Sequence, residues 1–381
     1  MAGIYFHIPY CKKKCHYCNF HFSTSLETKN EVYSALLKEL DLRKEFLGDQ
    51  KVETIYFGGG TPSLFETHEL DALLEKCHQQ FEVSADAEIT LEANPDDMSR
   101  EKIKSLQQIG INRLSIGIQS FFEEDLIYMN RSHSALQAES CIQTAQDAGI
   151  DNLSIDLIFG FPQLTDEKWK HNLDNALSKG VPHLSCYAMT VEPRTALSSM
   201  IDKGKTQPVS SEQVAGQYEY LMERLSEAGF EHYEISSFAK PGYRAVHNSN
   251  YWKGVHYLGI GPSAHSFNGN SRQWNVANNI LYARSISNNE CPLEMEILTP
   301  SQQLNERIMI GLRTSDGINL LSIQNSISPK EWTIFSARLE SYQKEGFCAI
   351  EKGSIKLTRK GKLFADQIAS DLFLDSAEED E

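Results

Sequence analysis

The sequence predicts an α/β protein: a partial (β/α)6 barrel followed by a smaller, mostly helical C-terminal domain. Through the first half of the chain, segments with strand-like alternation take turns with segments of helical periodicity. Unusual polar residues stand at the ends of several of these strands. After residue 299 the helical periodicity continues without a regular succession of strands. Strands that alternate with helices form a parallel sheet, either open or closed as a barrel.

The first strand is expected at 4–8, where IYFHI alternates, and it is followed by a helix over 27–46. Further strands are expected at 52–57, 88–93, 113–118, 153–159 and 183–189, and further helices at 99–108, 135–147 and 166–178. These segments make six β/α units, and a helix at 211–228 followed by HYEIS at 232–236 is a candidate seventh. Glycines stand just past three of the helices, where a left-handed cap residue is needed: Gly110, Gly149 and Gly180.

The positions of the polar residues favour a barrel over an open sheet. A cysteine-rich loop follows the first strand and a glycine run follows the second, while Glu92, Gln119 and Asp156 stand at or near the ends of later strands. In a barrel the carboxyl ends of all strands carry the active site, whereas an open sheet would concentrate these residues at one switch point.

Three regions are predicted along the chain. A barrel occupies 1–236, an irregular extension rich in Gly, Asn, Ser and aromatic residues occupies 237–298, and a helical domain of winged-helix type occupies 299–381. The last domain is expected to contain a hairpin (349–350 and 355–357) and a closing helix at 359–373. Its acidic tail, 375–381, is expected to be solvated and without structure.

Composition excludes several classes of protein. The 381 residues contain 36 Lys and Arg against 52 Asp and Glu, so the net charge of −16 disfavours general nucleic-acid binding. The only conspicuous basic cluster is Lys12 to Lys14. No apolar run approaches the ~18–20 residues that span a bilayer. The lysines near the start follow an apolar stretch, which is the wrong order for a secretory signal, so a cytoplasmic protein is expected.

Three of the eight cysteines, Cys11, Cys15 and Cys18, lie within eight residues. The other five are scattered among apolar neighbours and are expected to be core residues. Zinc would need a fourth ligand, which His16 or His21 could supply. A [4Fe–4S] cluster held by three cysteines would instead leave one iron open for a small molecule. The spacing favours the cluster and leaves zinc as the alternative.

The three-cysteine loop after a first strand resembles the signature of radical S-adenosylmethionine (SAM) enzymes. The segments YFHIPYC, FGGGTPS, LEANPDD, SIGIQSF, MNRSH and SIDLIFGFP are similar to the ordered motifs of the oxygen-independent coproporphyrinogen III oxidase family. YEISSFAKPG and HNSNYW resemble more narrowly its haem-chaperone branch, the HemW-type proteins. The likeness runs from residue 4 to about residue 270, with a weaker match beyond.

This resemblance implies a barrel of the radical SAM type and two cofactors. Cys11, Cys15 and Cys18 would hold a [4Fe–4S] cluster whose open iron chelates SAM, and reduction of the cluster would cleave SAM to a 5′-deoxyadenosyl radical. The residues that match the family's SAM contacts are Tyr5, Gly59, Gly60, Thr61, Glu92, Gln119, Arg131 and Asp156. Taken singly, several have plainer explanations: the glycines can mark a turn, Glu92 can cap a helix and Arg131 can lie on a surface.

Two features separate the haem-chaperone branch from the oxidase. The oxidase has a fourth cysteine where this chain has Phe20. His247, Tyr251 and Trp252 match the HNxxYW motif that the HemW-type branch associates with haem binding. A neutral histidine can ligate haem iron, and aromatic rings can pack on a porphyrin. The alternatives are an aromatic segment that only packs on the barrel, or His256 or His265 as the ligand, with His265 also placed to lie near SAM.

The expected function is therefore that of a haem chaperone, which binds the cluster, SAM and haem and delivers haem to acceptor proteins such as respiratory enzymes. An electron donor is a further expected partner, and nucleic acid is not. The rival function is the radical oxidative decarboxylation of coproporphyrinogen III, against which Phe20 and HNSNYW weigh. A third alternative is a purely structural cluster. The sequence leaves open whether SAM is cleaved, so the chain is not assigned as an enzyme.

Overall fold

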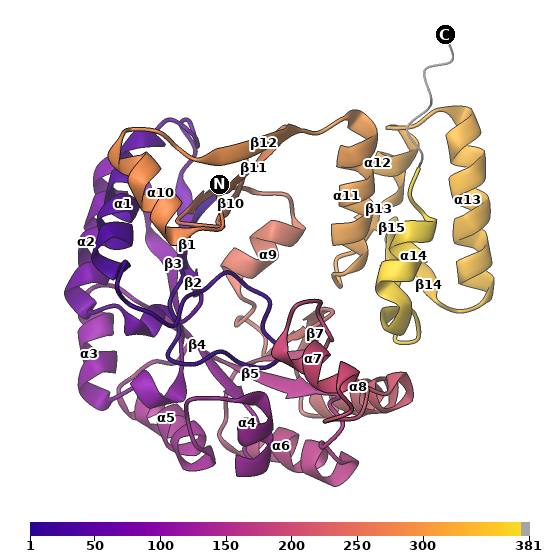
Figure 1. The fold of residues 1–381 in the computed structure, drawn as a ribbon. Coiled ribbons are helices and arrows are strands. Elements are labelled where there is room, and N and C mark those ends of the chain that lie inside the picture. The colour runs from indigo at the N-terminus through magenta and orange to yellow at the C-terminus, as the bar shows by residue number, and fades with distance from the viewer. Residues whose placement is uncertain (375–381) are drawn as a thin grey trace.

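The computed structural model describes residues 1–374, so the acidic tail lies outside the described residues. Six neighbouring parallel strands form the centre of a large curved sheet, with helices along its outer face (Figure 1). The strands are β1 (Ala2–Ile8), β2 (Val52–Gly59), β3 (Val83–Ala93), β4 (Arg113–Gln119), β5 (Leu153–Phe159) and β6 (His183–Ala188). The helices that accompany them are α1 (Lys29–Leu42), α2 (Thr67–Gln80), α3 (Arg100–Gln108), α4 (Glu123–Met129), α5 (Ala135–Asp147) and α6 (Asp166–Ser178). The predicted barrel architecture is confirmed.

Local chemistry explains where several helices begin and end. The hydroxyls of Ser99, Ser134 and Thr165 each accept a hydrogen bond from a backbone N–H in the first turn of α3, α5 and α6. The glycines that follow these helices adopt positive φ angles, at 99° for Gly110 and 93° for Gly149. Each helix is therefore closed by a residue type that favours its end, as the sequence suggested.

The candidate seventh β/α unit is wrong. After α7 (Ala196–Asp202) and α8 (Ser211–Glu227), β7 (Glu231–Glu234) pairs antiparallel with β8 (Ser237–Ala239), which in turn pairs antiparallel with β6. Only Ile235 and Ser236 separate β7 from β8. So short a connection can only reverse the chain, because parallel neighbours need a crossover of a dozen or more residues.

The segment 237–298 is more regular than the sequence suggested. Beyond β8, β9 (His256–Ile260) joins β1 in parallel, and β10 (His265–Phe267), β11 (Ser271–Asn275) and β12 (Leu293–Ile297) extend that edge antiparallel. Two helices, α9 (Val246–Trp252) and α10 (Asn279–Ser287), belong to the same segment. The glycines of this segment hide the apolar and polar alternation that marks a strand. The structure needs glycine at Gly259, because a Cβ there would stand 2.0 Å from the carbonyl oxygen of His265.

The C-terminal part has its own hydrophobic core, drawn from residues 304–374, while the core of the barrel is drawn from residues 2–286. Its elements follow the winged-helix order: α11 (Pro300–Leu312), β13 (Ile318–Asn319), α12 (Leu320–Gln324), α13 (Pro329–Lys344), β14 (Cys348–Glu351) and β15 (Ser354–Leu357). The 3-10 helix η3 (Gly361–Phe364) and α14 (Ala365–Asp371) close the chain. The separate cores support the proposed domain boundary near residue 299.

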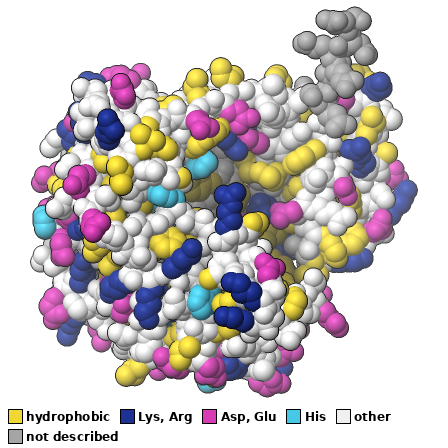
Figure 2. All heavy atoms as spheres, viewed as in Figure 1, with side chains coloured by type: hydrophobic (Ala, Val, Ile, Leu, Met, Phe, Trp, Pro, Cys, Tyr) yellow, Lys and Arg dark blue, Asp and Glu magenta, His cyan; other side chains and the backbone are white. Residues whose placement is uncertain are grey.

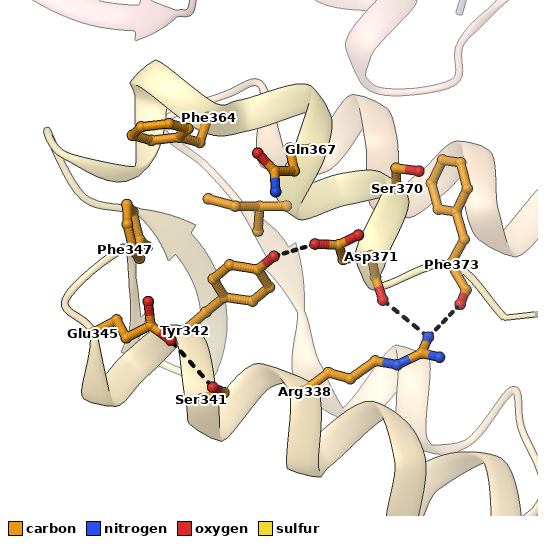
Figure 3. A pocket seen from close by; sticks show the side chains of 11 residues that line it. Arg338, Ser341, Tyr342, Glu345, Phe347, Phe364, Gln367, Ser370, Asp371 and Phe373 are labelled. Carbon is orange, nitrogen blue, oxygen red and sulfur yellow. Dashed lines mark hydrogen bonds between the residues drawn. The ribbon is translucent and has the colours of Figure 1, made fainter.

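A pocket of about 790 Å³ lies between α13 and α14 in this C-terminal part (Figure 3). The Arg338 guanidinium donates to the carbonyl oxygens of Asp371 (2.9 Å) and Phe373 (3.0 Å), and the Tyr342 hydroxyl donates to the Asp371 carboxylate. These bonds fasten the end of α14 to α13.

Within residues 1–374, no helix combines the length and apolar character needed to cross a membrane.

Candidate functional site

The three clustered cysteines lie on a loop whose two ends are held together. Tyr10 and Ser23 form an isolated bridge, the Cys11 N–H donates to the Ser23 carbonyl (3.0 Å), and the Ser23 N–H donates to the Pro9 carbonyl (2.8 Å). Cys11, Cys15 and Cys18 are all half-buried free thiols. Burial, with smaller effects from the other two thiols, raises the pKa of Cys11 to about 11. The three thiols therefore stand on one loop whose two ends are tied together.

Neighbouring elements fasten this loop from outside. The Asn130 amide donates to the Lys14 carbonyl (2.7 Å), and Lys12 pairs with Asp96 (2.8 Å). Both histidines that could complete a zinc site are engaged: His16 Nδ1 bonds the Tyr128 carbonyl (2.7 Å) and His21 Nε2 bonds Asn279 Oδ1 (2.7 Å). In the part of the chain that the structure describes, no three His, Cys, Asp or Glu side chains converge to hold one metal ion.

Arg131 connects the cysteine loop to the barrel interior. Its guanidinium lies 3.4 Å from Cys15 Sγ and donates to Asn94 Oδ1 (2.7 Å) and the Gly117 carbonyl (2.9 Å). Although burial opposes it, the neighbouring Tyr17 and Cys15 raise the pKa of Arg131. Its Nε is buried without a partner among residues 1–374. A permanent cation thus stands beside the thiol, where it would favour an anionic group bound there.

A cavity of about 450 Å³, here called the barrel cavity, opens next to the loop. It is lined by Tyr5, His7, Asn19, Phe20, His21, Gly59, Glu92, Tyr251, Tyr257, Ser263 and His265. Figure 2 shows the surface hollowed near the middle of this face, with Lys, Arg and His side chains around the hollow.

The glycines after β2 are required by packing within the protein. A Cβ on Gly59, whose φ is 107°, would stand 2.7 Å from His7 Nδ1, and one on Gly60 would stand 2.6 Å from the Tyr10 carbonyl. Thr61 is buried and lies 3.4 Å from the Asn94 amide. The glycine run therefore lets β2 pass close to β1 at the edge of the cavity.

Two carboxyls of the predicted site carry raised pKa values. Burial raises the pKa of Glu92 to about 7, although the Tyr56 hydroxyl donates to its Oε1 at 2.8 Å. Burial also raises the pKa of Asp156 to about 6, against a hydrogen bond from Ser185. Gln119 is buried at the end of β4 with a φ of 65°, a conformation that favours glycine. Backbone strain and perturbed carboxyls gather at functional sites.

His247 does not face the barrel cavity. Its ring is only 2% exposed, with Nδ1 bonded to the Thr54 hydroxyl (2.8 Å) and Nε2 to the Tyr251 hydroxyl (2.9 Å). Its backbone N–H donates to Glu88 (2.9 Å). Burial lowers the pKa of His247 to about 3, helped by Arg113. In this conformation no ring nitrogen is free to ligate iron, so the geometry matches the alternative in which the segment packs on the barrel.

The other two residues of the motif point in different directions. Tyr251 lines the barrel cavity, whereas Trp252 stacks under the Arg313 guanidinium at 5.3 Å, toward the C-terminal part. His256 lies against the Gln50 amide, and His265 lines the cavity and stacks on Trp274. His265 thus lines the same cavity as Tyr5 and Glu92, two of the residues that match the family's SAM contacts.

Sequence reasoning missed several residues of this site. His7 lines the cavity two positions after Tyr5, so the alternation of β1 was a signal that both side chains face the same side. Tyr257 and Ser263 also line it, but they come from a segment that was expected to be irregular.

Comparison with known proteins agrees with this geometry. Residues 5–176 match the model of the radical SAM superfamily, and residues 298–364 match that of the HemN C-terminal domain. The heme chaperone HemW of Bacillus subtilis is 32% identical over 97% of this chain and 98% of its own length. The heme chaperone HemW of Mycobacterium tuberculosis is 32% identical over 97% of this chain and 94% of its own length.

The solved structure of the coproporphyrinogen III oxidase HemN from Escherichia coli superposes with a TM-score of 0.84, covering 98% of this chain and 90% of that one. At 22% identity this likeness establishes the shared fold. The two family matches and the full-length relatives place the sequence more narrowly. The chain belongs to the radical SAM superfamily, in the HemW branch of the family that resembles the oxygen-independent coproporphyrinogen III oxidases.

Proposed function

We propose that this protein is a cytoplasmic haem chaperone that binds a [4Fe–4S] cluster, SAM and haem, and delivers haem to acceptor proteins such as respiratory enzymes. The proposal that the protein binds a cluster and SAM is supported by the closed loop, which has three free thiols and lies beside the barrel cavity. The HemW relatives, named heme chaperones and matched over nearly their whole length, support the haem part.

The residues around the cavity fit the proposed cofactors. Cys11, Cys15 and Cys18 would hold the cluster, which when bound would supply the electron for cleaving the sulfonium of SAM. Arg131 would hold Cys15 in place, and Glu92 and Tyr5 would face the polar parts of SAM. The Nε–H of Arg131 is buried and has no hydrogen-bond partner among residues 1–374, so it could donate to a bound ligand.

The cysteine assignment is tested by anaerobic reconstitution of the full chain with iron and sulfide. We expect a cluster absorbance spectrum in the wild type and its loss in Cys15→Ala. Cys291→Ala, which removes another half-buried thiol far along the sequence, is the matched control and should keep the spectrum. A full cluster in Cys15→Ala would contradict the assignment.

The chaperone and the oxidase are separated by two assays on the reconstituted protein. Haem titration followed in the Soret region should show stoichiometric binding, and coproporphyrinogen III with SAM and reductant should remain unconverted. Phe20, 69% exposed at the rim of the cavity, replaces the cysteine of the oxidase motif and cannot bind iron. Turnover of coproporphyrinogen III would favour the oxidase over the chaperone.

A further inference from the structure

A second pocket, here called the α8 pocket, lies where the barrel meets the C-terminal part and has a volume of about 550 Å³. It is enclosed by α8, by the ends of β5 and β6, by the turn between β7 and β8, and by η3 of the C-terminal part. None of its lining residues lines the barrel cavity. A volume of this size falls within the range of about 300–1,000 Å³ that is usual for small-molecule sites. The α8 pocket is thus separate from the candidate site and large enough for a ligand of its own.

Hydrogen bonds hold two walls of the α8 pocket in place. Behind α8, the Gln217 side chain accepts from the Gly160 N–H (2.9 Å), and the Trp169 indole N–H donates to the Gln217 carbonyl (2.9 Å). On the opposite side, the Arg359 guanidinium donates to the Glu219 carbonyl of α8 (2.6 Å), which fastens the segment that leads into η3. The walls are therefore already in position without a ligand, as in most small-molecule sites.

The inner surface of the α8 pocket is mostly apolar. The ring of Phe159 stacks on the ring of Tyr218 at 5.9 Å. The Tyr218 hydroxyl donates to the Ile235 carbonyl (2.7 Å), so its polar group is already satisfied by the protein. The apolar and aromatic lining residues are Phe159, Ala188, Val214, Ala215, Tyr218, Ile235, Leu363 and Phe364. A ligand that fills this space must therefore have an apolar body.

Lys362 places one cation in this apolar surrounding. The residue is half-buried, and among residues 1–374 its ammonium makes no hydrogen bond or ion pair. Burial lowers the pKa of Lys362 to about 8, opposed by the charge of Glu234. The hydroxyl of Ser236, which also lines the pocket, likewise makes no hydrogen bond within the described part of the chain. An ammonium and a hydroxyl without partners can together bind one anionic group.

The acidic residues near Lys362 limit the charge of such a ligand. Glu234 is engaged elsewhere, since it accepts from the Ser236 N–H (3.0 Å) and lies 3.7 Å from Arg313. Glu212 is an exposed residue of the lining. With one free cation and two carboxylates nearby, the pocket favours a ligand with a single negative charge over one with several.

We propose that the α8 pocket binds an amphiphilic monocarboxylic acid, an apolar body of the size of a medium-chain fatty acid, whose carboxylate pairs with the Lys362 ammonium and accepts from the Ser236 hydroxyl. This inference goes beyond the proposed haem-chaperone function and does not depend on it. Because the ligand would contact both α8 and η3, its binding should also raise the thermal stability of the full chain.

The test titrates the full chain with dodecanoate and with dodecanol, which has the same chain length and no charge, in a calorimeter. Lys362→Met should weaken dodecanoate binding about tenfold or more and leave dodecanol binding unchanged, because only the carboxylate can pair with the ammonium. Lys362→Arg should retain most of the affinity for dodecanoate. Lys330→Met, which removes one exposed charge from α13, is the matched control and should bind both ligands like the wild type.

A second pair of variants tests the pocket by volume. Ala215→Trp adds a large side chain to the α8 wall and should block dodecanoate and dodecanol alike. Gly216→Trp makes a similar addition at the next position of α8, which is exposed and has open space around it, and should bind both ligands like the wild type. Thermal unfolding of each variant without ligand confirms that it is folded.

Three results would overturn the inference. The first is a wild type that does not bind dodecanoate. The second is an affinity for dodecanoate that neither Lys362→Met nor Ala215→Trp lowers, since the acid would then bind elsewhere. The third is Lys362-dependent sedimentation with anionic phospholipid vesicles in the absence of dodecanoate binding, which would make a lipid surface the partner. Each of these results would leave the haem-chaperone proposal untouched, because its assays follow haem and the cluster.

Discussion

Arg131 shows how one side chain can join a loop to a barrel. Its guanidinium reaches Cys15 and Tyr17 on the loop, and Asn94 and Gly117 in the barrel. The planar fork of arginine can serve acceptors that lie in different directions, which a lysine ammonium on a flexible chain cannot reproduce. The spacing of the cysteines alone therefore does not explain how the loop is held.

We expect Arg131→Lys to lower the free energy of unfolding by about 2 kcal/mol, because buried acceptors lose their donors. Chemical denaturation of the protein without added iron measures this directly. Arg100→Lys, at an exposed position at the start of α3, should stay within about 0.5 kcal/mol of the wild type. Equal stability of the two variants would mean that the Arg131 contacts contribute little.

Glu92 should make stability depend on pH. Burial raises the pKa of this carboxyl in the folded protein to about 7 from the ordinary 4.5, so the folded state binds more protons than the unfolded state between those values. The free energy of unfolding should then fall as pH rises from about 4.5 to about 7, and this contribution should level off above that range.

Denaturation curves across this range should show a weaker fall with pH for Glu92→Gln than for the wild type. Glu27→Gln makes the same change at an exposed position and should keep the wild-type slope. Identical slopes for Glu92→Gln and the wild type would show that the Glu92 carboxyl titrates normally.

At the scale of elements, α9 lies on the inner side of the curved sheet (Figure 1). Its first backbone N–H groups, at Val246 and His247, donate to Glu88 of β3, and the His247 ring bonds Thr54 of β2. The histidine ring also lies 5.0 Å from the ring of Tyr56. The helix that carries the HNSNYW motif is thus fastened to two strands of the barrel.

His247→Phe should therefore destabilise the protein by about 2 kcal/mol, because the Thr54 and Tyr251 hydroxyls lose their buried partner. Val246→Ala, at a 42% exposed position on the same helix, is the control and should have a much smaller effect. Folded His247→Phe should also lose haem affinity in a Soret titration, as the resemblance to the HNxxYW motif implies. Unchanged haem affinity would instead support the alternative in which this segment only packs on the barrel.

For the molecule as a whole, Arg313 is one of the links between the barrel and the C-terminal part. Its guanidinium bonds Asp366 (2.7 Å), lies 3.7 Å from Glu234 and stacks on Trp252 (5.3 Å). Its backbone carbonyl also accepts from the Ile235 N–H (3.0 Å). One residue thus contacts the barrel hairpin, α9 and α14.

Arg313→Ala should weaken the coupling between the barrel and the C-terminal part. In scanning calorimetry we expect a separate, earlier transition for the C-terminal part, displaced by roughly 4–8 °C for a loss of about 1 kcal/mol in a domain of that size. Arg307→Ala, exposed on α11, should leave the profile of the wild type unchanged. A single, unshifted transition in Arg313→Ala would show that the coupling lies elsewhere.

The sequence by itself determined the β/α order, the cysteine loop after β1 and the placement of Glu92, Gln119 and Asp156 near strand ends. These features depend on residues close together in the chain, whose periodicity and spacing are visible in one sequence. It did not determine strands β8 to β12, because their glycines and short lengths hide the alternation. Only the tertiary structure decided that His247 is closed off, since Thr54, its partner, stands 193 residues away.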